Sequence, residues 1–179
     1  MSDLAPAWVE PTHQALRDAG VTLVGHVPDG GLKHLIGCCE RDPAIDCVSL
    51  TTEEEGIALV TGGWLGGSRG AVFMQSSGVG NCINMLSLLA SCQVPALLIV
   101  TMRGMGAETN PWQVPMGSIA REALSLQGVE VRTVATVDGV AATVTDLVGT
   151  IYDEGRTGAV LIDQAVIGVK QFVGDGESR

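Results

Sequence analysis

Three consecutive carboxylates, Glu53, Glu54 and Glu55, stand where an apolar segment gives way to a run of small residues. Carboxylates are favoured in the first turn of a helix by the positive end of the helix dipole. That effect accounts for two of the three. The run that follows, 56–67, contains five glycines, although each glycine in a helix costs about 1 kcal/mol relative to alanine. We therefore expect something to approach this helix closely.

A second polar group follows the next apolar segment and consists of Gln75, Ser76, Ser77, Gly78, Val79, Gly80 and Asn81. Backbone amides in such a loop can hold a phosphate at the start of a helix. The segment lacks the Lys-Ser/Thr of a P-loop and the complete dinucleotide-binding pattern of glycines. The alternative is a turn in which Asn81 caps the next helix. Both interpretations stay open.

Three further residues could contact a substrate. Asp29 lies in the turn-forming segment Val27-Pro28-Asp29-Gly30-Gly31, where a structural role in the turn is the alternative. Arg103 follows an apolar segment and could bind an anionic group bidentately, or pair with Glu108. Gln113 lies in the segment 104–116, which contains two prolines and is expected to be a long loop.

Composition limits the class of protein. The net charge of −10 and the pI near 4.5 argue against nucleic-acid binding, which depends on clustered Lys and Arg. No segment reaches the ~18–20 apolar residues that span a bilayer, and no signal peptide is expected. The five cysteines have no metal-binding spacing. We expect reduced thiols in a cytoplasmic protein, and no metal site formed by this chain.

The hydrophobic pattern predicts one α/β domain over residues 1–179, with residues 1–10 and 174–179 frayed. Expected strands alternate with expected helices. Six strands in this alternation predict a doubly wound, six-stranded parallel sheet flanked by helices. Ligands of such sheets bind at the carboxyl ends of the strands. The candidate residues lie there. The expected strands cover 21–24, 46–51, 71–74, 96–101, 130–134 and 159–162, and the expected helices 12–19, 31–40, 54–65, 81–90, 118–125 and 140–153.

The chain resembles the pyrimidine-binding domain of thiamine-diphosphate enzymes. In that family a glutamate opens a helix of the form E-x-x-x-A-x-x-x-x-G-[YW], which Glu54, Ala58, Gly63 and Trp64 fit. The segment MQSSGVGN, with Val-Pro-Asp before it and Arg-Gly after it, is similar to sulfopyruvate and phosphonopyruvate decarboxylases. The likeness covers roughly residues 23–128.

The resemblance implies roles for these residues. Glu54 would bind the pyrimidine and activate the cofactor from an apolar setting, while Glu53 and Glu55 would be solvated carboxylates at the helix start. The segment 75–81 would lie against the pyrimidine. Asp29 would assist proton transfer. Gln113 and Arg103 would contact the substrate.

Gly174-Asp175-Gly176 resembles the start of the family's magnesium–diphosphate motif, but only three residues follow it. The resemblance therefore implies a separate beta subunit that binds Mg²⁺ and the diphosphate, in a hetero-oligomer that shares thiamine diphosphate between its chains. The implied reaction is decarboxylation of a small anionic 2-keto acid, 3-sulfopyruvate first and phosphonopyruvate second. A non-catalytic flavodoxin-like binding module is the alternative from another class.

Overall fold

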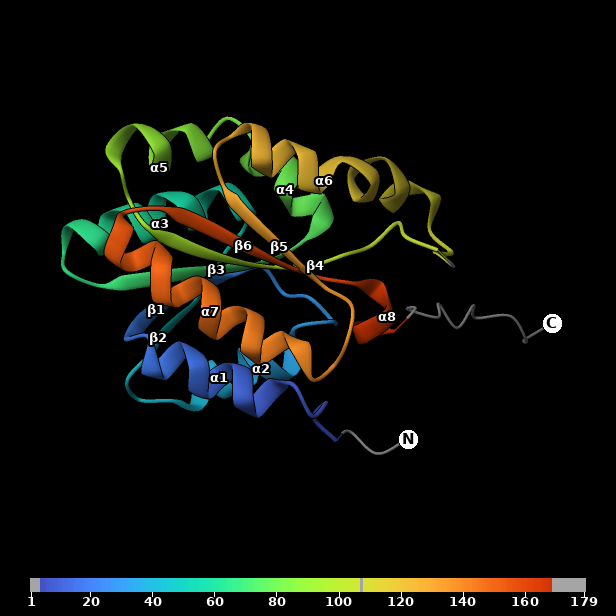
Figure 1. Cartoon of the computed structure of the whole chain (residues 1–179), viewed down its shortest axis with the longest axis horizontal. Coiled ribbons are helices and arrows are strands. Elements are labelled where there is room, and N and C mark those ends of the chain that lie inside the picture. The colour runs from blue at the N-terminus through green and yellow to red at the C-terminus, as the bar shows by residue number, and fades with distance from the viewer. Residues whose placement is uncertain (1–3, 107, 169–179) are drawn as a thin grey trace.

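The computed structural model describes residues 4–106 and 108–168. One sheet of six parallel strands forms its centre, in the order β2-β1-β3-β4-β6-β5 (Figure 1). The strands are β1 (Val21–His26), β2 (Asp46–Ser49), β3 (Arg69–Gln75), β4 (Ala96–Thr101), β5 (Glu130–Val134) and β6 (Thr157–Ile162). This confirms the predicted doubly wound architecture.

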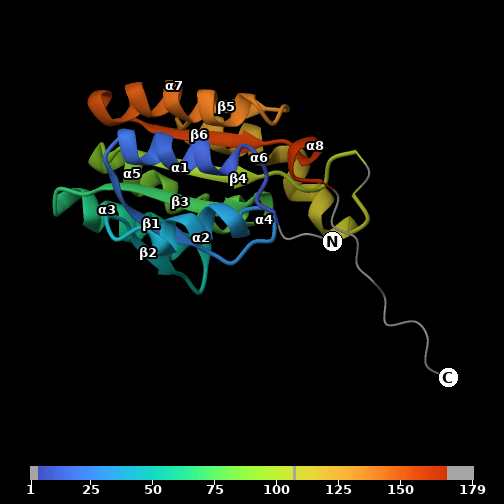
Figure 2. The same cartoon turned by 90° about the horizontal axis from the view of Figure 1, so that it is seen from below.

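Helices cover both faces of the sheet (Figures 1 and 2). One layer is α1 (Val9–Asp18), α2 (Lys33–Arg41) and α7 (Gly139–Glu154). The other is α3 (Glu53–Leu65), α4 (Ser76–Cys82), α5 (Leu86–Cys92) and α6 (Val114–Leu126). The short helices η1 (Pro111–Gln113) and α8 (Gln164–Ile167) lie outside these layers. Because both faces are covered, the central strands are mostly apolar, and every residue of β4 is buried.

Two of the three glycines of α3, Gly56 and Gly63, face the sheet. A β-carbon on Gly56 would lie 2.6 Å from Cγ1 of Val72 in β3, and one on Gly63 would lie 2.5 Å from Cδ2 of Leu23 in β1. Gly62, by contrast, has no atom within 4 Å of that position. The close approach that the glycine content predicted is therefore the packing of α3 on β1 and β3.

Three expectations about chain organisation are corrected. The expected helix 81–90 is two helices, α4 and α5, and α4 starts directly after β3. The expected loop 104–116 ends early, because η1 and the first turn of α6 occupy 111–116. In the segment expected to fray, Trp8 and Val9 are buried against the sheet layer. Residues 174–179, including the Gly-Asp-Gly sequence, lie outside the described residues.

Two glycines of α3 provide a matched test of this packing. We expect Gly56→Ala to destabilise the chain by about 1–3 kcal/mol, because the added methyl group overpacks against the stiff side chain of Val72. Gly62→Ala should stabilise it by up to about 1 kcal/mol, because alanine favours the helix and meets no neighbour. Urea unfolding of both variants measures the difference. Two changes of the same sign would contradict this account of the helix.

Candidate active site

The carboxyl ends of β1 and β3 form the point where the strand order reverses, since the chain runs outward from β1 to β2 and returns to β3 on the other side. Open α/β sheets bind ligands at this position. Asp29 follows β1, Gln75 ends β3, and Thr101 ends β4. The structure brings these three side chains together.

Asp29 is held by two side chains. Its Oδ1 accepts a hydrogen bond of 3.0 Å from Nε2 of Gln75, and its Oδ2 accepts one of 2.7 Å from Oγ1 of Thr101. Ser77 donates in turn to Oε1 of Gln75 at 3.2 Å. Sequence analysis named Asp29, Gln75 and Ser77 but missed Thr101, although its place as the last residue of a buried strand was a usable signal.

The three glutamates have three different environments. Glu55 forms a capping box with Thr52, and its carboxylate accepts hydrogen bonds from the amides of Thr51 and Thr52. Glu54 is exposed. Glu53 is buried, with 9 % of its surface exposed. The expectations that Glu54 has an apolar setting and that Glu53 is solvated are both wrong.

Helical geometry explains why Glu53 is buried and Glu54 exposed, because successive side chains rotate by about 100° around the helix axis. Glu53 faces α4, and the next residue points to solvent. The sequence held a signal for this register, since Gly62 stands nine residues after Glu53, as Gly63 does after Glu54. The pair of adjacent glycines left the register ambiguous by one residue.

The buried carboxylate of Glu53 is fixed from α4. Its Oε2 accepts a hydrogen bond of 2.8 Å from Nδ2 of Asn81. A β-carbon on Gly78 would lie 2.5 Å from Cγ, Cδ and Oε1 of Glu53, so only glycine fits at that position of α4. Burial raises the pKa of the nearby Cys82 thiol to about 12, with the charge of Glu53 adding to the effect. Cys82 therefore stays protonated and serves packing.

The segment expected as a loop, 76–81, is the helix α4. Ser76 and Val79 are fully buried, and Oγ of Ser76 accepts a hydrogen bond from the amide of Arg103 at 3.1 Å. Both residues thus have structural roles, and their contacts with a cofactor stay a prediction. Asn81 lies inside α4 and does not cap a helix. Gly80 packs near Met116 of α6.

Arg103 does not offer its charge to a ligand. It is buried, and its Nε and one terminal nitrogen bind both carboxylate oxygens of Glu108 at 2.7 and 2.8 Å. Glu108 also accepts from the amides of Gly104 and Asn110 and from Gln164 of α8. These bonds, with Arg103 first, lower the pKa of Glu108 well below its ordinary value. The structure therefore shows the alternative, pairing of Arg103 with Glu108 within this loop, and contact of Arg103 with a substrate stays a prediction.

Gln113 is half-buried at the end of η1, and its Oε1 is a buried atom without a hydrogen-bond partner. The backbone carbonyl group of Gln113 packs against Gly104, where a β-carbon would lie 2.3 Å from the backbone oxygen. Its neighbour Trp112 is 83 % exposed. The contact of Gln113 with a substrate stays a prediction.

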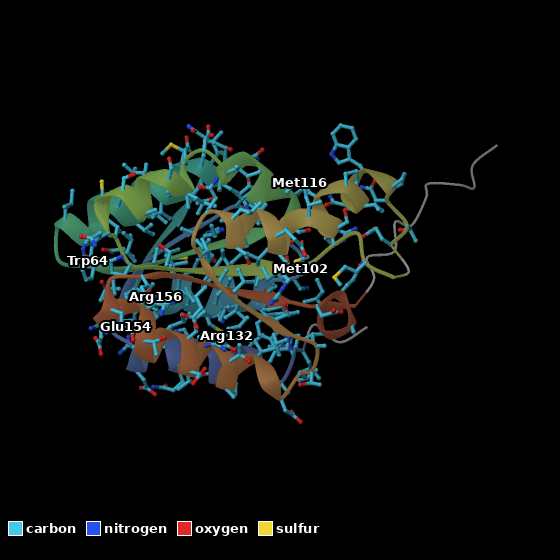
Figure 3. The ribbon with its side chains drawn as sticks, turned by 45° about the horizontal axis from the view of Figure 1, so that its top comes forward. Trp64, Met102, Met116, Arg132, Glu154 and Arg156 are labelled. Atoms are coloured by element: carbon cyan, nitrogen blue, oxygen red, sulfur yellow. The ribbon has the colours of Figure 1, made fainter. Side chains whose placement is uncertain are left out.

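Two other arginines, Arg132 and Arg156, lie in surface ion pairs. Figure 3 shows Arg132, Glu154 and Arg156 away from Met102 and Met116, which flank the loop after β4. Arg156 pairs with Glu130 and Glu154, and Arg132 pairs with Glu130. Within residues 4–106 and 108–168, no group of three or more His, Cys, Asp or Glu side chains could hold a metal ion. The helices of this described part include none that could cross a membrane.

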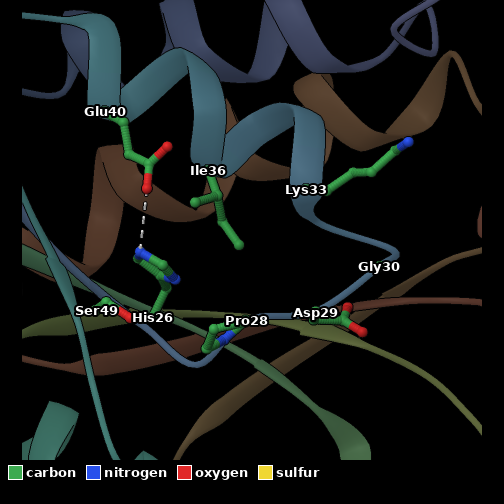
Figure 4. A pocket seen from close by; sticks show the side chains of 8 residues that line it. All are labelled: His26, Pro28, Asp29, Gly30, Lys33, Ile36, Glu40 and Ser49. Atoms are coloured by element: carbon green, nitrogen blue, oxygen red, sulfur yellow. Dashed lines mark ion pairs between the residues drawn. The ribbon is translucent and has the colours of Figure 1, made fainter. Parts of the chain in front are cut away.

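A pocket of about 430 Å³ adjoins Asp29 on the α2 face of the sheet. Its wall includes His26, which is 4 % exposed and has no hydrogen-bond partner at either ring nitrogen. Oε1 of Glu40 lies 3.9 Å from its Nε2 (Figure 4). Burial lowers the pKa of His26 from 6.5, while Glu40 opposes that shift. Sequence analysis gave no signal for this environment.

Comparison with known proteins identifies the family. No family model matches the chain. The sulfopyruvate decarboxylase subunit alpha of Methanothermobacter thermautotrophicus is 32% identical over 155 residues, which cover 86% of this chain and 94% of that protein. The subunit of the same name from Methanococcus maripaludis is 39% identical over 116 residues, or 64% of this chain and 70% of that one. The chain belongs to the sulfopyruvate decarboxylase alpha-subunit family.

Two further relatives extend this result. The phosphonopyruvate decarboxylase of Streptomyces viridochromogenes is 40% identical over 117 residues, but the match covers only 30% of its length. The 2-oxoglutarate:ferredoxin oxidoreductase of Magnetococcus marinus has the same fold, with a TM-score of 0.69 over 95% of this chain and 34% of that one, at 16% identity. The domain thus also occurs within longer chains.

The buried ion pair of the loop can be tested by amide substitution. We expect Glu108→Gln to destabilise the chain by about 3 kcal/mol, because it leaves the guanidinium of Arg103 buried without a counter-charge. Asp153→Asn is the matched control, since Asp153 is exposed and pairs with Arg69 at the surface. It should cost less than about 1 kcal/mol. Equal decreases in the free energy of unfolding of the two variants would show that the Arg103–Glu108 pair behaves like a surface ion pair.

The buried imidazole predicts a dependence of stability on pH. Because the folded chain holds the pKa of His26 below 6.5, the unfolded chain binds more protons as the pH falls below that value. The free energy of unfolding should therefore decrease from pH 6.5 downward, and His26→Leu should lessen this decrease. Glu40→Gln should make the decrease steeper, because it removes the charge that favours imidazolium. Identical pH profiles for the three proteins would contradict the assignment.

Proposed function

We propose that this chain is the alpha subunit of a thiamine-diphosphate-dependent decarboxylase that converts 3-sulfopyruvate to sulfoacetaldehyde and CO₂. One observation carries the proposal. The buried carboxylate of Glu53 opens α3 beside the strand-order reversal, with Asn81 on one oxygen and Gly78 against its stem. A carboxylate kept out of water is the group required to bind a ring nitrogen of the pyrimidine.

The described residues fit the pyrimidine half of the cofactor. Glu53 would hold the ring by a hydrogen bond, from a carboxylate that Asn81 and Gly78 of α4 keep in place. When bound, thiamine diphosphate supplies the electron sink for decarboxylation of a 2-keto acid. Glu53 in this proposal replaces Glu54 as the activating carboxylate, since Glu54 is exposed.

Replacement of CO₂ by hydrogen on the substrate also requires proton delivery. Asp29 lies at the same edge of the sheet, held by donors from β3 and β4. We assign it the proton-transfer role. Arg103 has no free charge for the substrate, so the sulfonate is bound by other groups, from the beta subunit in this proposal.

A beta subunit would supply the magnesium–diphosphate site. The support is that relatives aligned over 70% and 94% of their length are named subunits, and that the described residues contain no metal-binding cluster. Phosphonopyruvate is the second candidate substrate, favoured by the 40% identity to a phosphonopyruvate decarboxylase. The ratio of kcat/KM for the two keto acids decides between them.

The decisive experiment replaces one carboxylate oxygen by an amide nitrogen, in Glu53 and, separately, in Glu54. In the complex co-expressed with its beta subunit, Glu53→Gln should lower kcat by about 10²–10⁴-fold, because an amide cannot share a proton with the cofactor. Glu54→Gln is the matched control and should keep near wild-type turnover. Aldehyde release from 3-sulfopyruvate is the measurement, with the alpha chain alone as the inactive blank. Loss of activity in Glu54→Gln instead would return the role to Glu54.

A further inference from the structure

The carboxylate of Asp29 accepts hydrogen bonds from residues of two neighbouring strands, β3 and β4. Gln75 and Thr101 are direct partners in the register of β3 and β4, so their side chains emerge side by side at the edge of the sheet. Gln75 donates to Oδ1 of Asp29, and Thr101 donates to Oδ2. The side chain of Asp29 is thereby fixed in position, although its own loop contributes no element of regular structure.

Both donors are themselves held in place. Ser77 donates to Oε1 of Gln75, so the amide nitrogen of Gln75 faces Asp29. Thr101 is fully buried, and its branched β-carbon restricts the rotation of the hydroxyl-bearing bond. A β-carbon on Gly31 would lie 3.0 Å from both Oδ2 of Asp29 and Cγ2 of Thr101. The contact between these two side chains thus depends on a small residue at position 31.

We propose that Thr101 is a positioning residue that acts on the reaction through Asp29, an inference that rests on the proposed function. Decarboxylation breaks the bond between the keto carbon and CO₂, and the electron pair left behind takes up a proton from solvent to form the aldehyde C–H bond. Asp29 relays that proton. The Thr101 hydroxyl holds the carboxylate of Asp29 in a fixed orientation for that transfer.

A hydroxyl-deleting substitution tests this role. In the complex with the beta subunit, Thr101→Val should lower kcat about tenfold to a hundredfold, the effect of one lost hydrogen bond to a charged group. The KM for 3-sulfopyruvate should change less than about threefold, because substrate binding does not use this hydroxyl. Thr101→Ser keeps the hydroxyl and should restore most of the turnover. Thr12→Val, which removes another fully buried hydroxyl in α1, is the matched control and should leave kcat unchanged.

A double-mutant cycle shows whether Thr101 acts through Asp29. Thr101→Val should have no further effect on kcat in an Asp29→Ala background, because the group it positions is absent. The hydroxyl proton of Thr101 should give a slowly exchanging NMR resonance in the alpha chain that shifts in Asp29→Ala and disappears in Thr101→Val.

Two outcomes separate the inference from the function on which it rests. An active wild-type complex with additive losses in the cycle, or with full turnover in Thr101→Val, overturns the inference alone. A wild-type complex that decarboxylates neither keto acid overturns the proposed function and this inference with it.

Discussion

The carboxylate of Glu53 is buried, and the elements around it supply the contacts that this burial requires. A buried carboxylate is costly unless it is hydrogen-bonded. Asn81 supplies the donor from the second turn of α4, and Gly78 removes the side chain that would otherwise displace Glu53. The two helices can meet this closely because α4 begins at once after β3 and α3 lies on β3 through its glycines.

At the same edge of the sheet, the two residues to which we assign catalytic roles lie near a residue that holds a loop. Asp29 and Glu53 follow β1 and β2, and each is fixed by donors from other elements. Arg103 follows β4 but serves the loop, where Glu108 and Gln164 fix its position. A buried cation that is paired in this way has no free charge for another anion.

The sequence alone predicted most of the strands and helices. The hydrophobic pattern predicted six strands, two of them with the observed bounds. The central strands were recognisable because they are covered on both faces and are mostly apolar. The prediction was less accurate for 76–81, where two glycines and two serines indicate a loop by local propensity. That segment is helical because its buried residues pack between β3 and α6, and packing outweighs the propensity of a single turn.

The order of residue types along the chain determined the family, the doubly wound sheet and the group of side chains at its carboxyl edge. The sequence could not determine which glutamate is buried, because neighbouring positions in a helix differ only in the direction they face. It could not show that Thr101 binds Asp29, which is 72 residues away, or that Arg103 is taken by Glu108. Those outcomes depend on contacts between elements, and only the tertiary structure decides them.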